Sequence, residues 1–527
     1  MRSMRIWRTF PVTSLLAAAL LCGCVGPDFV RPAAPETETY AAKPLPAETV
    51  ATEVAGGEAQ HFLPGRDIPA EWWTLFHSEP LNALIKRALA ANPSMRSAQA
   101  ALRVAEENLS AQIGAFAPTV QGSFSSTRTK NAGGSVSGST TQTSPVTNLH
   151  TAQLSVAYTP DVWGANWRQV EGLEAQAEAQ RFQLEATYLT LTSNVVVAAI
   201  NEASLRGQIV ATEEIIRGER ELLDILRRQF ALGQIAEADV VAQEAALAQL
   251  EQTLPPLEKQ LEQQRDALTA LLGRLPHEEP AETFELASLQ LPRDLPVSLP
   301  SKLVEQRPDI RQAEANLHAA SAQVGVAIAN RLPLINLTAD MGSVASLITG
   351  KDEGYSPTKV GLFTPGTGFW TLGGSVAQTI FDGFSLMHKQ RAAEAALEQA
   401  EADYRTAVIT AFQNVADALS ALRLDAKALQ SAATTASKAR ESLQITRQQL
   451  ELGAISYPAL LAAQQIEIQA RINLVQTQAN RYADTAALFQ ALGGGWWNRT
   501  DTTGITAAND GKTDGKPPSW LERAWPY

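Results

Sequence analysis

The chain has 527 residues, of which 55 are acidic and 43 are basic, giving a formal net charge of -12. This charge argues against a nucleic-acid binder, which needs basic patches that displace counterions from phosphates. Hydrophobic residues make up 45% of the chain and charged residues 19%, so disorder throughout is excluded, and the length predicts two or more structural units. Two cysteines, Cys22 and Cys24, are too few for a disulfide framework.

The N-terminus predicts export. Three arginines precede an apolar stretch, 14–21, that is too short to span a membrane. The run Leu21-Cys22-Gly23-Cys24 that follows resembles a bacterial lipobox. We expect Cys24 to carry the lipid, because Leu21 stands before Cys22 where a small residue is needed; an ordinary signal peptide cut nearby is the alternative.

The residues after Cys24 indicate its destination. Val25 and Gly26 follow Cys24, and the lack of an Asp directly after this cysteine resembles lipoproteins that are sent on to the outer membrane. No later segment has 18 uninterrupted apolar residues, and no transmembrane helix is predicted.

The chain contains an internal duplication. Residues 92–96 (Asn-Pro-Ser-Met-Arg) correspond to 307–311 (Arg-Pro-Asp-Ile-Arg), and further along the spacing becomes 220, where 227–235 correspond to 447–455. The predicted organisation has five parts: a signal peptide at 1–23, a lipidated extended segment at 24–78, a first repeat at 79–290, a second repeat at 291–497 and a loose tail at 498–527.

In chain order, each half reads as helix, strand, strand, long helix, turn, helix. The first helices are predicted at 93–116 and 308–331, both beginning with Pro, which a first helical turn tolerates. The long helices are predicted at 165–231 and 385–451, about 100 Å each at 1.5 Å per residue.

An apolar stripe follows the first long helix. Its members recur at spacings of four and three and are interrupted by Thr212 and Glu219, which predicts a coiled-coil seam in an elongated bundle. The stripe consists of Leu205, Ile209, Ile216, Leu223, Leu226 and Phe230.

Four short segments alternate with period two, at 119–125, 151–159, 335–341 and 370–376. One face is apolar and the other small and polar, as in a membrane β-barrel, although strands of a soluble sandwich alternate in the same way. The Gly-, Ser- and Thr-rich stretches 130–148 and 342–368 are expected to be exposed loops, which favours the barrel. The predicted membrane-facing residues are Val120, Phe124, Leu154, Tyr158, Leu337 and Trp370.

Four strands are too few to close a barrel, since known barrels start at about eight, and an open sheet edge is excluded in lipid. The strands of several copies must therefore combine. Three copies would supply twelve, although closure alone does not set that number.

Several runs resemble one family. They are Cys24-Val25-Gly26-Pro27-Asp28-Phe29, Trp72-Trp73 with Phe76, the stretch from Arg307 to Glu314, and Ala491-Leu492-Gly493-Gly494-Gly495-Trp496. Together with the duplication, they resemble the TolC-type outer-membrane efflux proteins over residues 20–497, specifically the NodT-like lipoprotein group that serves tripartite drug pumps.

This resemblance implies a mainly α fold with a small β part. A homotrimer would have a twelve-stranded barrel in the outer membrane and a helical tunnel in the periplasm. It would export small toxic compounds, as in drug resistance, delivered by an inner-membrane pump of the resistance-nodulation-division (RND) class through a periplasmic adaptor. The residues matching the family's adaptor-docking tips are Leu232, Gly233, Ile235, Leu452, Gly453, Ile455 and Ser456.

The sequence departs from the family at the inner gate. Related channels often have Leu-Leu-Asp-Ala-Gln followed by Arg, whereas this chain has Leu460-Leu461-Ala462-Ala463-Gln464 followed by Gln465. A carboxylate ring at that point is therefore in doubt, and either Asp239 or an apolar constriction at Leu460 is the candidate substitute.

No catalytic or metal-binding motif is present, and the six histidines are scattered, so we expect no enzyme, cofactor or metal site. The alternatives are a type I protein secretion channel and a lipidated coiled-coil scaffold without a pore. The lipobox and the Arg-Pro-Asp-Ile-Arg run favour the efflux channel over the first, and the repeated helix-and-strand unit favours it over the second. The sequence does not identify the exported compound.

Overall fold

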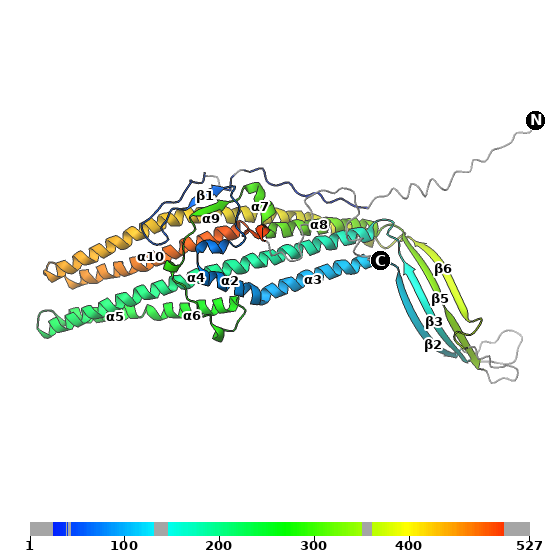
Figure 1. Ribbon diagram of the computed structural model, residues 1–527, viewed down its shortest axis with the longest axis horizontal. Helices are drawn as coiled ribbons and strands as arrows, with labels where there is room; N and C mark the ends of the chain where they lie inside the picture. Colours follow the sequence, from blue (N-terminus) through cyan, green and yellow to red (C-terminus); the bar gives the residue numbers. More distant parts are fainter. Residues whose placement is uncertain (1–24, 38, 41–43, 131–145, 350–360, 500–527) are drawn as a thin grey trace, which may run out of the picture.

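The computed structural model describes residues 25–37, 39–40, 44–130, 146–349 and 361–499. These residues form an elongated molecule in which long helices run side by side and a curved sheet lies at one end (Figure 1). The predicted lipidation site, Cys24, lies outside the described residues, as does the tail beyond Arg499.

The sheet is antiparallel, with the strand order β2-β3-β5-β6. Its strands are β2 (Thr119–Lys130), β3 (Val146–Tyr158), β5 (Leu334–Thr349) and β6 (Gly368–Ala377). All four predicted segments are strands, but the predicted loops 130–148 and 342–368 were too long, because the start of β3 and the end of β5 belong to the sheet. These strand ends mix apolar residues such as Val146 and Val344 with Gly, Ser and Thr without strict alternation, so the period-two pattern did not detect them.

The helices account for most of the chain. They are α2 (Glu79–Ala91), α3 (Pro93–Ile113), α4 (Ala165–Ala231), α5 (Glu237–Glu251), α6 (Leu254–Leu271), α7 (Pro300–Gln306), α8 (Pro308–Ala329), α9 (Ser385–Glu451) and α10 (Tyr457–Ala491). The long helices α4 and α9 have the predicted limits. The helices α3 and α8 end two or three residues early, and α3 continues as the 3-10 turn η2 (Gly114–Phe116).

The two halves differ in the helix that returns from the far end. In the second half it is the continuous α10, but in the first half it is divided into α5 and α6. Pro255 and Pro256 cause the division, because proline fits the first turn of a helix and disrupts its interior. The corresponding positions in α10 are Val475 and Gln476.

The main core lies at mid-length, where the non-repeated segments pack on the helices. The 3-10 helix η1 (Trp72–Phe76) buries three aromatic side chains there, and Trp72 stacks on Phe489 with ring centroids 5.3 Å apart. A two-stranded parallel sheet, β1 (His61–Pro64) with β4 (Asp294–Val297), lies beside it. The resemblance run Trp72-Trp73 with Phe76 is therefore a packing feature.

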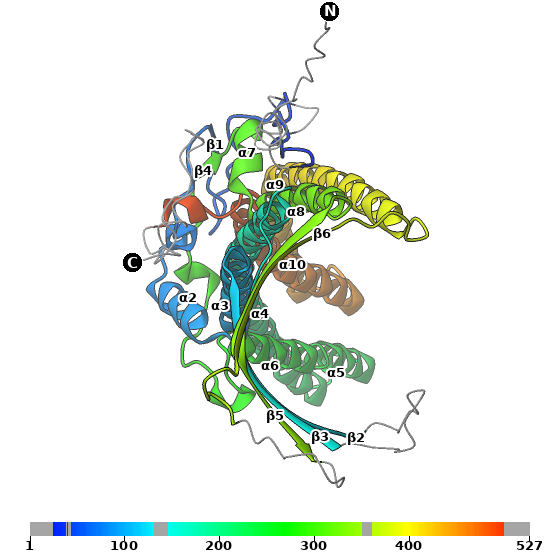
Figure 2. The same ribbon diagram turned by 90° about the vertical axis from the view of Figure 1, so that its right-hand side faces the viewer.

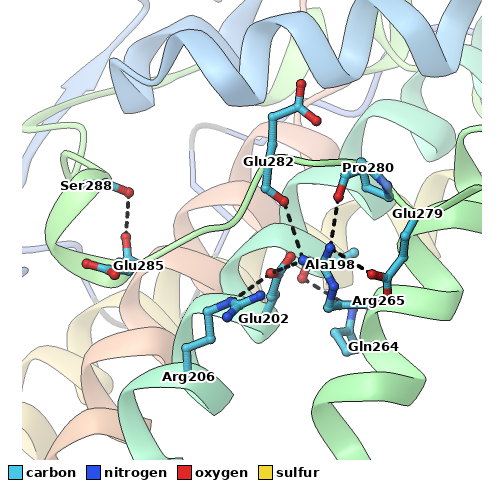
Figure 3. A network of polar contacts seen from close by, with 10 residues as sticks. All are labelled: Ala198, Glu202, Arg206, Gln264, Arg265, Glu279, Pro280, Glu282, Glu285 and Ser288. Atoms are coloured by element: carbon cyan, nitrogen blue, oxygen red, sulfur yellow. Dashed lines mark hydrogen bonds and ion pairs between the residues drawn. The ribbon is translucent and has the colours of Figure 1, made fainter. Parts of the chain in front are cut away.

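A buried ion pair ties the first half together in this region (Figure 3). Arg265 on α6 donates to Glu202 on α4 at 2.8 Å, and Arg206 donates to the same carboxylate at 2.9 Å. Arg265 also donates to the carbonyl oxygens of Pro280 and Glu282, which belong to the linker between the two halves. Glu202 is fully buried, so these contacts compensate a charge removed from water.

The helices continue the strands in the same lateral order. α3 leads into β2, β3 leads into α4, α8 leads into β5, and β6 leads into α9, while neighbouring helices pack in the order α3, α4, α8, α9. Along the long axis, the strands and helices follow an arc (Figure 2). The described chain is thus a curved wall with β2 and α3 on one side and β6 and α9 on the other.

Candidate transport site: the sheet and the hairpin tips

One face of the sheet is apolar across all four strands. In one row Val120 pairs with Val156, Val156 with Ala339 and Ala339 with Leu372; in the next row Leu154 pairs with Met341 and Met341 with Trp370. Paired residues of an antiparallel sheet share a face, so the alternation predicted separately for each strand combines into a single surface. All six predicted membrane-facing residues lie on this face.

The opposite face is polar in the corresponding rows. Gln121 pairs with Ser155, Ser155 with Asp340 and Asp340 with Thr371. Gln153 donates to the Asp340 carboxylate at 2.8 Å and to the Ser155 hydroxyl at 2.7 Å. The hydrogen bonds hold these side chains along the sheet surface, leaving a face of small hydroxyl, amide and carboxylate groups.

Two edges of the sheet are left open. Within the described residues, β2 pairs only with β3, and β6 pairs only with β5. Each outer edge therefore presents a row of backbone N–H and C=O groups to whatever adjoins it. In hydrocarbon, where no water is available, each unsatisfied group costs several kcal/mol.

The other end of the molecule has two matching hairpin tips. Gly233 and Gly453 both have φ +70°, and the residue after each donates its N–H back to the helix, Gln234 to Gln229 and Ala454 to Gln449. A Cβ atom would meet no neighbour at either glycine, so the positive φ is the reason for glycine here.

The tip side chains project from these turns. Leu232 and Leu452 are 73% and 84% exposed, Ser456 is exposed, and Ile235 and Ile455 are half-buried. Both tips thus present a leucine beside a tight glycine turn, and their adaptor-docking role stays a prediction.

The structure does not bring the three candidate gate residues together. Asp239 is half-buried in the first turn of α5, and Gln465 is exposed on α10. Leu460 is 1% exposed and packs with Leu223 and Leu226 in the apolar cluster between the hairpins. In this structure Leu460 therefore stabilises the hairpin pair.

A buried polar cluster near the tips was missed by the sequence analysis. Gln243 on α5 donates to the Glu219 carboxylate on α4 at 2.6 Å, and Gln464 on α10 donates to it at 2.7 Å. The Tyr457 hydroxyl donates to Gln243, and all four side chains are buried. Burial raises the pKa of Glu219. The sequence contained one signal for this cluster, because Glu219 interrupts the apolar stripe of the first long helix.

The start of the described chain is fixed where strands meet helices. Arg168, buried near the start of α4, donates to the carbonyl oxygens of Val25 and Gly26 and to the carboxylate of Asp28. Phe29 stacks on the His318 ring with centroids 4.3 Å apart. The run Val25-Gly26-Pro27-Asp28-Phe29 thus holds residue 25 at the junction between the sheet and the helices.

The sequence matches the family described as outer membrane efflux protein over residues 84–274 and 299–494, which is most of the chain. The chain belongs to the outer membrane efflux protein family. It is therefore an efflux channel protein of the outer membrane, and its helices extend into the periplasm.

Individual relatives agree with this assignment. The pyoverdine export outer membrane protein OpmQ of Pseudomonas putida is 28% identical over 429 residues, covering 81% of this chain and 88% of OpmQ. The cation efflux system protein CusC of Escherichia coli is 29% identical over 493 residues, covering 91% of this chain and 97% of CusC. The outer-membrane channel OprN has the same fold, with a TM-score of 0.76, 24% identity and coverage of 90% of this chain and 99% of OprN.

The described part of this efflux protein contains neither a membrane-spanning helix nor a cluster of metal ligands. None of its helices is both long and apolar enough to cross a bilayer. In the same residues, no three His, Cys, Asp or Glu side chains are grouped so that they could hold a metal ion.

Proposed function

We propose that three copies of this efflux protein form a passive exit duct across the outer membrane. The observation that carries the proposal is the four-stranded sheet with two open edges and one apolar face. If β6 of one copy pairs with β2 of the next, every edge in the bilayer is satisfied. Two copies would give eight strands, whose interior is filled by side chains, whereas twelve leave room for a passage.

The two faces of the sheet then have separate roles. The apolar face, with Val120, Leu154 and Trp370, meets lipid, and the polar face, with Gln121, Ser155 and Asp340, lines the duct. A lining of small polar groups selects little, so the exported compounds are chosen upstream. Relatives are named for pyoverdine export (OpmQ), toluene efflux (TtgC of Pseudomonas putida) and cation efflux (CusC), and we assign this chain only the general class of small toxic compounds.

The duct needs partners that supply energy. We assign delivery to an inner-membrane RND pump and a periplasmic adaptor that docks on the hairpin tips around Gly233 and Gly453. The exposed Leu232 and Leu452 suit such docking, because an adaptor can cover them without disturbing the core.

The lipid anchor is assigned to Cys24. Cys24 directly precedes Val25, which Arg168 binds at the junction of sheet and helices, and this supports an anchor at the membrane boundary. Cys24→Ser should remove the lipid, measured by mass, and leave the oligomer membrane-bound through its barrel. Release of the variant as a soluble monomer would contradict the barrel.

The test of the proposed function is conductance of the purified mature protein in planar bilayers, together with its mass in detergent. A trimer that gives discrete, mostly closed ohmic openings supports the duct. A monomer or dimer without conductance would favour the lipidated scaffold instead.

A matched pair of variants tests the two faces. Phe124→Lys, on the apolar face at the middle of β2, should impair membrane insertion by about 2–4 kcal/mol. Ser123→Lys, on the opposite face of the same strand, should insert normally and alter conductance instead. Insertion is measured by folding into vesicles, and equal defects in the two variants would contradict the assigned faces.

A further inference from the structure

The turn between β6 and α9, residues 380–384, lies at the boundary between sheet and helices (Figure 1). It carries three exposed apolar side chains. Ile380, Phe381 and Phe384 are 90%, 76% and 60% exposed. The two phenylalanine rings pack edge to face with centroids 5.8 Å apart. We call residues 380–384 the β6–α9 turn.

Phe384 adopts a backbone conformation that disfavours a bulky residue. Its φ is +68° at the N-cap of α9, in the left-handed region that phenylalanine rarely occupies. The corresponding position in the first half, 220 residues earlier, is Gly164, the N-cap of α4 with φ +77°. The turn before the long helix is thus made by glycine in the first half, without backbone strain. Because the turn itself does not require phenylalanine, we expect the Phe384 side chain to have a role of its own.

The β6–α9 turn is well defined. The N–H of Leu386 donates to the Asp382 carboxylate at 2.7 Å, and the N–H of His388 donates to the Phe384 carbonyl at 3.0 Å. The first turn of α9 is thus anchored, and the aromatic pair is presented on a fixed support.

The position of the β6–α9 turn identifies what covers it. β6 and α9 are last in the lateral order of strands and helices, and β2 and α3 are first. When β6 pairs with β2 of the next copy, the β6–α9 turn meets that copy's α3–β2 junction. At this junction Phe116 packs against the partly exposed Trp167 in the first turn of α4, with ring centroids 5.5 Å apart.

The helices below the turn are compatible with this contact. About ten residues into α9, Ala392, Ala395 and Ala396 are exposed. About ten residues before the end of α3, a groove of about 650 Å³ lies between α3 and α4, lined in part by Ala101 and Val104. Small side chains facing a groove allow two helices to approach closely.

We propose that Phe381 and Phe384 of one copy pack against Phe116 and Trp167 of the next, forming an aromatic contact between subunits at the membrane boundary. The proposal rests on the assembly of several copies proposed above. It adds the residues that fix one subunit against its neighbour.

Photo-crosslinking of the full-length lipoprotein in outer membranes tests the contact directly. Benzoylphenylalanine replaces Phe384, and Phe363, another exposed phenylalanine with positive φ, serves as the matched control position. We expect the probe at 384, and not at 363, to link two copies through peptides 114–120 and 163–168. Attachment to lipid or to its own chain, in protein that still forms the oligomer, would overturn the contact alone. An unmodified protein with no oligomer would overturn the proposed assembly itself.

A second variant distinguishes the contact from a role within one chain. Phe384→Gly relieves the unfavourable φ, so without a subunit contact the temperature at which the oligomer dissociates in SDS should stay the same or rise. The proposal requires that temperature to fall. Phe363→Gly measures the effect of relieving φ alone, and a Phe384→Gly oligomer at least as stable as this control would overturn the proposal.

Discussion

The two halves of the chain each form a helix of 67 residues, but use it differently. In α4, 27 residues are buried, and in α9 only 12 are. α4 packs against α2, α3, α5, α6, α8 and α10, whereas α9 packs mainly against α8 and α10. The helix α4 therefore lies in the interior of the protomer, and α9 leaves a long helix face for the neighbouring copies of the proposed assembly.

The halves also use buried charge differently at equivalent positions. Glu202 and Arg265 form an ion pair in the first half, where the second half has the buried Leu422 and Thr485. The second half instead buries Arg481, which donates to the carbonyl oxygens of Gly56 and Glu58 and to Gln60. In each half, an arginine on the returning helix thus donates to carbonyl oxygens of a segment outside the helices, but from a different position along that helix.

Breaking the first-half ion pair should have the largest effect. Arg265→Met leaves the fully buried Glu202 with Arg206 alone, and we expect a loss of about 3–5 kcal/mol of local stability. Hydrogen exchange of residues 276–288 measures it. The double variant Glu202→Leu with Arg265→Thr, which copies the second half, should recover most of the loss. A double variant as unstable as Arg265→Met would show that the halves are not interchangeable here.

The helices were more predictable than the contacts between them. The limits of α4 and α9 follow from long polar-apolar periodicity that ends at Gly233 and Gly453, both local signals. The Glu219 cluster could not be read in this way, because its partners Gln243 and Gln464 lie 24 and 245 residues away in sequence. A polar residue in an apolar stripe was visible, but only folding determines what it contacts.

The Glu219 cluster is a further difference between the two halves, because the residue of α9 equivalent to Glu219 is Ala439. Gln464→Leu removes one of the two amide donors to a buried carboxylate, and we expect the hairpins to lose about 1–3 kcal/mol, measured by hydrogen exchange at residues 235–245. The adjacent Gln465→Leu, at an exposed position, is the matched control and should have little effect. Equal effects would mean that the cluster adds no stability.

A carboxyl pair in the second half has no titrating counterpart at the equivalent positions of the first half. Burial, reinforced by a hydrogen bond with Asp425, raises the pKa of Asp484 to about 7. The equivalents in the first half are Gln264 and Leu205, which do not titrate. A raised carboxyl pKa means that the folded state binds the proton more tightly, so this contribution to stability is complete below about pH 4 and is lost as pH rises toward 7.

Asp484→Gln, which copies the first half, should flatten that slope. The difference is expected to be about 1–2 kcal/mol, because the pair is only partly shielded from water. Thermal unfolding followed by circular dichroism between pH 4.5 and 7.5, at one scan rate, measures it. The reciprocal variant in the first half is Leu205→Asp. It introduces a carboxyl at the position equivalent to Asp425, without the partner that Asp484 provides in the second half. An unchanged slope in Asp484→Gln would assign the pH dependence to other groups.

The two halves should respond in the same way to substitution at their hairpin tips. Gly233 and Gly453 have the same φ of +70° and the same hydrogen-bonded turn, and a Cβ would meet open space at both. Alanine at either position should lower the stability of its hairpin by about 1 kcal/mol, because only the left-handed backbone conformation disfavours it. Gly233→Ala and Gly453→Ala should therefore destabilise their hairpins equally, by hydrogen exchange at residues 229–236 and 449–456. Unequal effects on stability in the isolated protein would mean that one tip is held by contacts the other lacks.

If the two variants are equally stable but differ in efflux, the difference would instead be assigned to the adaptor, because the folded tips are alike.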